Sequence, residues 1–145
     1  MSKMRSFTLL ELVIVIIIVG ILATLGIYPY ISSRERALGR EARANLQLIA
    51  AAERIWKMES ANNAYTACSC LCAGTAATCC NDAAVGCNIL LRLNLNIQNW
   101  TYGVVAAGTG AAATFTATAT RTAGTEINNT ITLNQADAWA GSFTF

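Results

Sequence analysis

The stretch SFTLLELVIVIIIVGILATLGIYPY, Ser6–Tyr30, decides the fold, because it is largely apolar and holds a single charged residue, Glu11. As a helix, residues 7–31 would extend over about 37 Å, more than the ~30 Å hydrocarbon core of a bilayer. A carboxylate within that core costs at least about 2.5–3.5 kcal/mol. We therefore predict that residues 7–31 form a transmembrane half of a helix, and that a partner neutralises Glu11.

The chain as a whole is more apolar than a soluble protein, and this apolar excess is not spread evenly along it. The chain has 145 residues, of which 54% are hydrophobic and 12% are charged, whereas soluble domains carry about 25% charged residues. That length allows one domain with a modest core, or half of one if much of the chain is membrane helix. We assign residues 32–145 to this head domain.

The first six residues have the features of a leader. Lys3 and Arg5 precede the apolar run, and the small residue Ser6 lies directly before it. The run is about twice the usual 7–15 residues of a secretory signal, and no A-x-A site ends it. A cut after Ser6 would leave the helix on the mature protein, with Phe7 as its N-terminus. We predict a leader at residues 1–6.

The sequence KMRSFTLLELVIVIIIVGILATLGIYPY, residues 3–30, resembles the leader and N-terminal helix of type IV pilins and type II secretion pseudopilins. The resemblance implies that a prepilin peptidase cuts after Ser6 and methylates Phe7, and that Glu11 is the glutamate of the family pattern. The chain departs from that pattern in two places. Ser6 replaces the usual Gly before the cut, and Pro29 comes one residue late.

The same resemblance implies that residues 7–31 become the filament-core half of the helix after assembly, and it gives Glu11 a role in that assembly. In a helical filament, the cationic N-terminus of a neighbouring copy lies near Glu11, and each charge neutralises the other. The alternative is a glutamate that lines a polar channel or extends to the membrane interface. We expect the pairing role.

Beyond Ser33 the helix becomes amphipathic. Apolar residues recur at three- and four-residue steps, at Leu38, Ala42, Leu46, Ile49, Ala52 and Trp56. Charged residues fill the remaining faces, and we predict a solvated i,i+4 pair between Glu53 and Lys57. A nearly continuous helix over about 7–60 is expected, with its second half as the spine of the head domain.

Residues 61–92 are predicted to form a cysteine-rich loop. Six cysteines occur within 20 residues, at Cys68, Cys70, Cys72, Cys79, Cys80 and Cys87. An even, dense set is typical of an oxidising compartment, so we predict disulfides and place residues from about 32 onward outside the cytoplasm. Six cysteines allow 15 pairings, and these stay open. A metal or iron–sulfur site is the alternative, but C-x-C-x-C lacks the usual spacing and the chain has no histidine.

From Trp100 the apolar period changes to two, which predicts an antiparallel sheet over residues 100–134. The strand candidates are WTYGVVAA, ATFTATATRT and NTITLN. In the second, threonines face one way and Phe115, Ala117, Ala119 and Arg121 face the other. The tail with Trp139, Phe143 and Phe145 is an edge strand or a packed end. The fold class is therefore α+β: a long helix, packed by its C-terminal half on a small sheet, with a disulfide-stapled loop.

No catalytic, cofactor-binding or metal-binding residues are predicted. The chain has no histidine, and past residue 60 its carboxylates are Asp82, Glu126 and Asp137, which form no nucleophile–base pair in the sequence pattern. Loss of the leader leaves eight basic against eight acidic residues, so no nucleic-acid partner is expected. We do not expect an enzyme.

These features favour a structural subunit of a type IV pilus-like extracellular filament that assembles through its N-terminal helix. Pseudopilins of type II secretion share the same N-terminus and are the alternative, as is a minor pilin for adhesion or DNA uptake. The partners expected are copies of this chain, a prepilin peptidase and the pilus or secretion assembly machinery. The precursor would reside in the inner membrane before the subunit enters a filament on the cell surface.

Two N-x-[ST] motifs are candidate glycosylation sites. The first begins at Asn99 and the second at Asn128, which has Glu126 two residues upstream, the acidic position that bacterial N-glycosylation prefers. The alternative is that these are ordinary turn and strand residues.

Overall fold

The computed structural model describes residues 8–70, 80–81, 86–124 and 127–143, and of residues 25–29 only the backbone. The chain divides into two compact units, Met1–Ala37 and Leu38–Phe145. Helix α1, Leu9–Glu59, has 51 residues and belongs to both units. It is continuous through Gly20, Pro29 and Gly39, which confirms the long N-terminal helix expected from the sequence.

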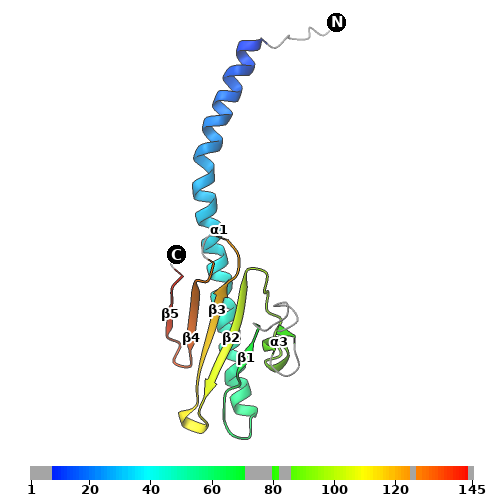
Figure 1. Ribbon diagram of the computed structural model, residues 1–145, viewed down its shortest axis with the longest axis vertical. Coiled ribbons are helices and arrows are strands. Elements are labelled where there is room, and N and C mark those ends of the chain that lie inside the picture. Colours follow the sequence, from blue (N-terminus) through cyan, green and yellow to red (C-terminus); the bar gives the residue numbers. More distant parts are fainter. Residues whose placement is uncertain (1–7, 71–79, 82–85, 125–126, 144–145) are drawn as a thin grey trace. The chain divides into compact units, whose positions relative to one another are not determined.

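The second unit contains a five-stranded sheet whose spatial order, β1-β2-β3-β4-β5, is also the order in sequence (Figure 1). Every neighbouring pair is antiparallel. The strands are β1 (Cys68–Ser69), β2 (Trp100–Ala107), β3 (Thr114–Arg121), β4 (Thr130–Asn134) and β5 (Trp139–Gly141). The three predicted strands are thus confirmed as β2, β3 and β4, and the tail supplies the edge strand β5.

The predicted loop over residues 61–92 contains regular structure that the sequence did not indicate. Within it lie strand β1 and the short helix α3, Cys87–Leu90. Strand β1 has only two residues, paired with Val104 and Gly103, so no alternation could reveal it. A further 3-10 turn, η1, Gly110–Ala112, lies between β2 and β3.

One face of the sheet forms the core of this unit. In β3, Phe115, Ala117 and Ala119 are buried, while the threonines between them are exposed or half-buried, as the period-two pattern predicts. Ala117 lies between Val104 of β2 and Leu133 of β4 in the register of the three strands. These side chains pack with the buried Leu46 and Ile49 of α1 in one cluster.

The predicted Glu53–Lys57 pair is wrong. Glu53 is fully buried, because it continues the inward stripe of α1 that passes through Leu46 and Ile49 at helical spacing. Its Oε2 accepts a hydrogen bond from the Thr66 N–H at 2.9 Å, while Oε1 has no partner among the described residues. Lys57 instead lies over the Tyr65 ring, 4.7 Å from its centroid.

Burial is the main cause of the raised pKa of Glu53. Removing the carboxylate from water raises its pKa from 4.5 to about 7, and the hydrogen bond from the Thr66 N–H lowers it only in part. Glu53 therefore keeps its proton to a higher pH than an exposed glutamate does.

Two positions, one after strand β2 and one in strand β5, require glycine. Gly108, after β2, has φ 74°, and a Cβ there would lie 2.7 Å from the Ala112 carbonyl oxygen. Gly141 in β5 has φ 134°, and a Cβ would collide with the Thr130 carbonyl. Any other residue at either position would strain the backbone or displace a strand.

Candidate functional site

The candidate assembly site is the first turn of α1. Thr8 precedes the helix, and its carbonyl oxygen and Oγ1 accept the Glu11 N–H at 3.1 and 3.3 Å. Thr8 and Glu11 have the spacing of a capping box, in which a threonine caps the first turn and a glutamate follows three positions later. This cap was not predicted from the sequence, although the T-x-x-E spacing of Thr8 and Glu11 indicates it.

The Glu11 carboxylate itself has no hydrogen bond or ion pair within the described part of the chain. Its side chain is exposed. Ser6 and Phe7, the predicted processing residues, lie outside the described residues. The geometry therefore leaves a carboxylate at the start of an apolar helix, available to a group from another molecule.

The helix that follows is apolar on all sides. Between residues 9 and 22, every large apolar side chain is exposed, from 39% for Val13 to 83% for Leu9. A helix that is apolar all round needs an apolar environment on all sides. Nothing in the described part of its own unit supplies one.

Among the described residues, we find no helix with a stretch long and apolar enough to cross a membrane. The span predicted over residues 7–31 includes Phe7 and the side chains of residues 25–29, which are not described. It stays a prediction.

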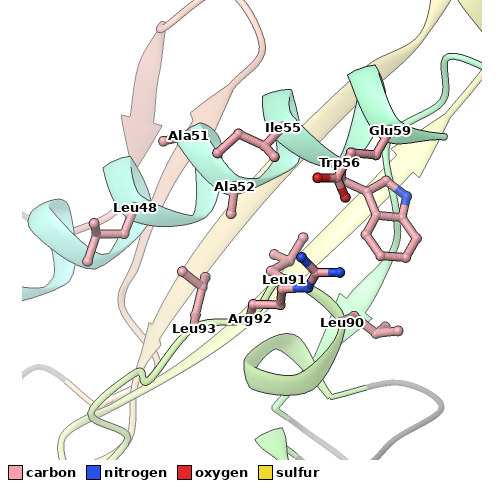
Figure 2. Close-up of a pocket in the computed structure, with 10 residues that line it drawn as sticks. All are labelled: Leu48, Ala51, Ala52, Ile55, Trp56, Glu59, Leu90, Leu91, Arg92 and Leu93. Atoms are coloured by element: carbon pink, nitrogen blue, oxygen red, sulfur yellow. The ribbon is translucent and has the colours of Figure 1, made fainter.

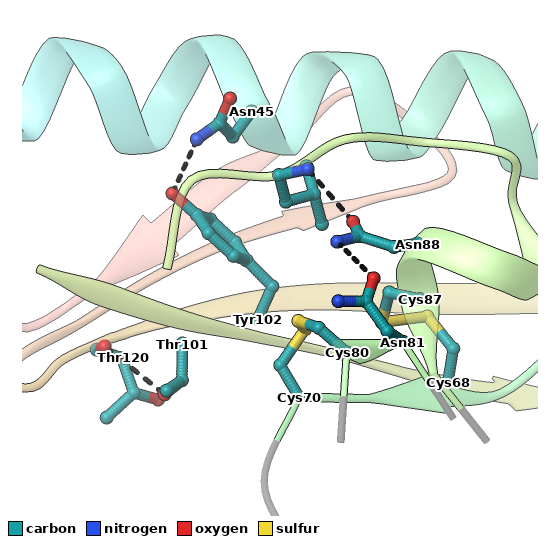
Figure 3. Close-up of a disulfide and its surroundings, with 11 residues drawn as sticks. Asn45, Cys68, Cys70, Cys80, Asn81, Cys87, Asn88, Thr101, Tyr102 and Thr120 are labelled. Atoms are coloured by element: carbon teal, nitrogen blue, oxygen red, sulfur yellow. Dashed lines mark hydrogen bonds between the residues drawn. A yellow bond between two sulfur atoms is a disulfide. The ribbon is translucent and has the colours of Figure 1, made fainter. Parts of the chain in front are cut away.

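Two disulfides join the cysteine-rich segment to itself (Figure 3). Cys68 of β1 is bonded to Cys87 of α3, and Cys70 is bonded to Cys80. All four are buried. The second bridge lies inside the loop that the first one closes. The structure thus assigns two of the pairings that the sequence left open, while Cys72 and Cys79 lie outside the described residues and their pairing stays a prediction.

A buried asparagine organises the same segment. The Asn88 side chain donates to Asn81 Oδ1 at 3.2 Å and accepts the Leu95 N–H at 2.9 Å (Figure 3). These bonds connect the short helix α3 to the chain on both sides of it. No group of three or more histidine, cysteine or acidic residues that could hold a metal is found where the chain is described.

A groove of about 380 Å³ lies between the C-terminal half of α1 and the segment that includes α3 (Figure 2). Glu59 and Arg92 are its charged residues, and the rest of its lining is apolar: Leu48, Ala51, Ala52, Ile55, Trp56, Leu90, Leu91 and Leu93. This lining offers contact with apolar surface and contains no nucleophile with an adjacent base.

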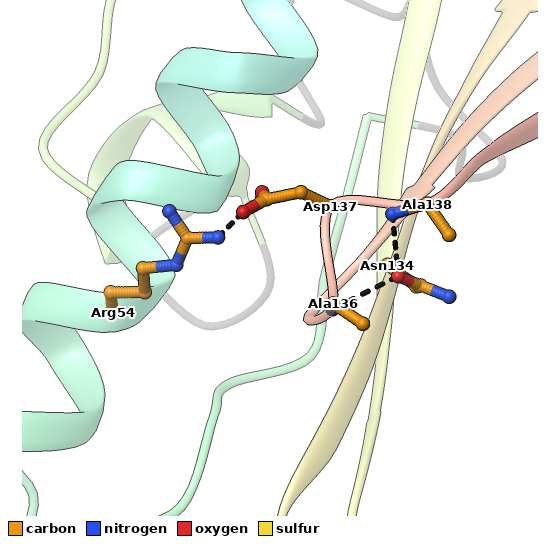
Figure 4. Close-up of polar contacts among 5 residues, drawn as sticks. All are labelled: Arg54, Asn134, Ala136, Asp137 and Ala138. Atoms are coloured by element: carbon orange, nitrogen blue, oxygen red, sulfur yellow. Dashed lines mark hydrogen bonds and ion pairs between the residues drawn. The ribbon is translucent and has the colours of Figure 1, made fainter.

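The turn between β4 and β5 is tied to α1 by an ion pair. Arg54 donates to Asp137 Oδ1 at 2.5 Å (Figure 4). Asn134 shapes the turn, because its Oδ1 accepts the N–H groups of Ala136 and Ala138 at 2.9 and 3.0 Å. Asp137, past residue 60 the only carboxylate that the structure describes, is therefore occupied by an arginine.

Residues 1–27 match the family model of a prokaryotic N-terminal methylation motif. This motif is the leader signature of type IV pilins and pseudopilins, so the resemblance noted in the sequence is confirmed. Such a leader implies cleavage by a prepilin peptidase, membrane insertion and assembly into pilus-type filaments. No curated protein and no solved structure matches the chain. The motif therefore supports a type IV pilin-like or pseudopilin protein, and the α+β fold is consistent with one.

Proposed function

We propose that this protein is a structural subunit of a type IV pilus-like extracellular filament, assembled through the N-terminal half of α1. The carrying observation is the combination of the methylation motif over residues 1–27 with a helix whose apolar side chains are exposed on all sides from Leu9 to Leu22. Removal of the leader after Ser6 and methylation of Phe7 would precede assembly. Packed copies would supply each other with the apolar surroundings that one chain lacks.

Glu11 sets the register of that packing. Its backbone N–H is occupied by Thr8, which fixes the first helical turn, while its carboxylate is left without a partner in the described chain. The amine of a neighbouring Phe7 would satisfy this carboxylate. A copy displaced along the axis would bury both charges unpaired, which is strongly unfavourable.

The head favours a pilus over a secretion pseudopilus. Major secretion pseudopilins carry an acidic, calcium-binding loop near the C-terminus. In this chain only the segment Asp137–Ala138–Trp139 slightly resembles that loop. Here Asp137 bonds to Arg54, and its turn is completed by the amide of Asn134. A turn whose carboxylate is already paired offers little to a calcium ion, which takes six to eight oxygen ligands.

Glu11→Ala tests the assembly role directly. We expect membrane insertion to be unchanged, because the helix becomes more apolar, and the yield of sheared filaments to fall at least tenfold. Glu59→Ala, which removes an exposed carboxylate from the other end of α1, is the matched control and should assemble normally. Wild-type filament yield from Glu11→Ala would refute the pairing role.

Electron microscopy of purified filaments tests the filament type. We expect long surface fibres made of this chain, and an intact mass that begins at a methylated Phe7. Short assemblies confined to the periplasm would favour the pseudopilin. A filament subunit that retains residues 1–6 would exclude the proposed processing.

A further inference from the structure

The chain carries two N-x-T motifs, and the structure places them in contrasting surroundings. We propose that Asn128 is an N-glycosylation site, which accepts an oligosaccharide from a lipid diphosphate-linked donor outside the cytoplasm, whereas Asn99 is not modified. The proposal needs only export of the head domain, so it goes beyond filament assembly and does not depend on it.

Asn128 presents its side chain to solvent. It is exposed, lies in the turn between β3 and β4, and has φ 70°. Its backbone is anchored, because its N–H donates to the Arg121 carbonyl oxygen at 2.9 Å. The side-chain amide has no hydrogen-bond partner within the described residues. A sugar attached there would extend into water and displace no packed side chain.

The hydroxyl residue of this motif is accessible as well. Thr130 begins β4 and is half-buried, and its backbone N–H donates to the Ser142 side chain at 3.0 Å. No described group bonds to its hydroxyl. The two side chains that define an N-x-T acceptor, Asn128 and Thr130, are thus both accessible and have no described hydrogen-bond partner.

The Asn99 motif is enclosed by the sheet. Trp100, which follows it, is fully buried, and Thr101 is 3% exposed. The Thr101 hydroxyl donates to the Thr120 carbonyl oxygen at 3.4 Å. A transferase that must recognise that hydroxyl would have to separate β2 from β3.

The backbone of Asn99 is occupied too. Its carbonyl oxygen accepts both the Arg121 guanidinium, at 3.1 Å, and the Thr122 N–H, at 3.0 Å. Arg121, whose carbonyl oxygen accepts the Asn128 N–H, therefore also holds the backbone of Asn99 through its guanidinium group. One chain thus provides an accessible motif and an inaccessible one.

The transfer is a substitution at the anomeric carbon of the donor. A bond forms between Asn128 Nδ2 and that carbon, and the bond from that carbon to the diphosphate oxygen breaks. The lipid diphosphate leaves with the electron pair, and the amide nitrogen loses one proton. No atom changes its net oxidation state, so the transferase and the lipid-linked donor suffice.

Trypsin separates the two motifs cleanly. Cleavage after Arg92 and Arg121 gives peptide 93–121, which contains Asn99, and peptide 122–145, which contains Asn128. In protein purified from its own cells, mass spectrometry should show a hexose- or hexosamine-bearing form of peptide 122–145 and an unmodified peptide 93–121. An unmodified peptide 122–145, or sugar on peptide 93–121 alone, would overturn the proposal.

Variants locate the attachment. Asn128→Asp keeps a residue that tolerates positive φ but removes the amide nitrogen, so the glycan should be lost. Thr130→Ser should keep the modification, and Thr130→Ala should lose it, while Asn99→Asp should change nothing in peptide 122–145. Sugar that persists in Asn128→Asp would be linked elsewhere, for example to a threonine of the sheet, and would refute N-linkage at Asn128.

Discussion

Helix α1 contributes to two units that differ in how far their apolar side chains are exposed. Between residues 9 and 22 every large apolar side chain is exposed, whereas Ala42, Leu46 and Ile49 further along are fully buried in the head. The head satisfies its apolar surface within one chain. The described residues of the first unit do not, and under the proposed function a membrane or other copies of the chain supply the apolar surroundings. Predictions that separate the two units therefore test the proposal.

The largest effect is expected from one substitution made in both units. Leu46→Ala should lower the free energy of unfolding of the head by about 2–5 kcal/mol, because it empties a fully buried position. Leu12→Ala, at an exposed position, should leave that free energy within about 0.5 kcal/mol. Urea unfolding in detergent, followed by tryptophan fluorescence, measures the head alone, since Trp56, Trp100 and Trp139 all lie in Leu38–Phe145.

Filament yield should reverse this order. Leu12→Ala removes apolar contact between copies and should reduce assembly, while Leu46→Ala should assemble wherever its head remains folded. Equal destabilisation of the head by both substitutions would remove the distinction between the units.

The disulfide between Cys68 and Cys87 should give the next largest effect. Its cysteines are 19 residues apart, and closing a loop of about this size stabilises a fold by roughly 3 kcal/mol. Replacing both with Ala should lower the free energy of unfolding of the head by that amount and leave the membrane-bound fraction unchanged. The pair Cys70 and Cys80, 10 residues apart, should cost less. A larger loss for this inner pair would contradict the loop-length argument.

Glu53 should make the stability of the head depend on pH. Its pKa is raised to about 7 in the folded chain from 4.5, so between these values the folded state holds a proton that the unfolded state has released. The free energy of unfolding should therefore fall as pH rises from 4.5 to 7, and level off above 7, by about 1–3 kcal/mol in all.

Glu53→Gln should flatten this profile and raise the stability of the head at pH 8 relative to the wild type. Glu59→Gln, at an exposed position on the same helix, is the control and should keep the slope. Urea unfolding at several pH values measures both. A slope that persists in Glu53→Gln would assign the pH dependence to other groups.

The smallest effect is expected from the ion pair of Arg54 and Asp137, whose side chains are 45% and 64% exposed. A double-mutant cycle with Arg54→Gln and Asp137→Asn should give a coupling of about 0.2–1 kcal/mol. The coupling should disappear at about 1 M salt, where the screening length is about 3 Å. A coupling that survives such salt would indicate a buried rather than a surface interaction.

The sequence predicted those helices and strands whose residue pattern repeats over many positions. A largely apolar run of 25 residues, a stripe at helical spacing and threonines that alternate with Phe115, Ala117 and Ala119 each define an element by repetition. Short elements carry no such repetition. Strand β1 is fixed by its pairing with β2 and by the bridge from Cys68 to Cys87, both of which depend on residues distant in sequence.

At the candidate site, the leader and Glu11 could be recognised from the N-terminal motif. The cap from Thr8 could have been found as well, since its signal is the residue spacing alone. Glu53 shows the opposite case. A charged residue is normally assigned to the solvated face, and only its place on the inward stripe with Leu46 and Ile49 indicates burial.

The sheet is a meander, in which spatial order repeats sequence order, and this has a consequence for folding kinetics. From β2 to β5, each strand pairs with the strand made just before it. The pairings among these four strands join segments close in sequence, which keeps the contact order low for a β structure, whereas β1 and β2 pair across the cysteine-rich segment. A chain that is synthesised from its N-terminus has α1 complete first and can then add β1 to β5 one at a time. From β2 onward, each new strand meets a partner that has already been made.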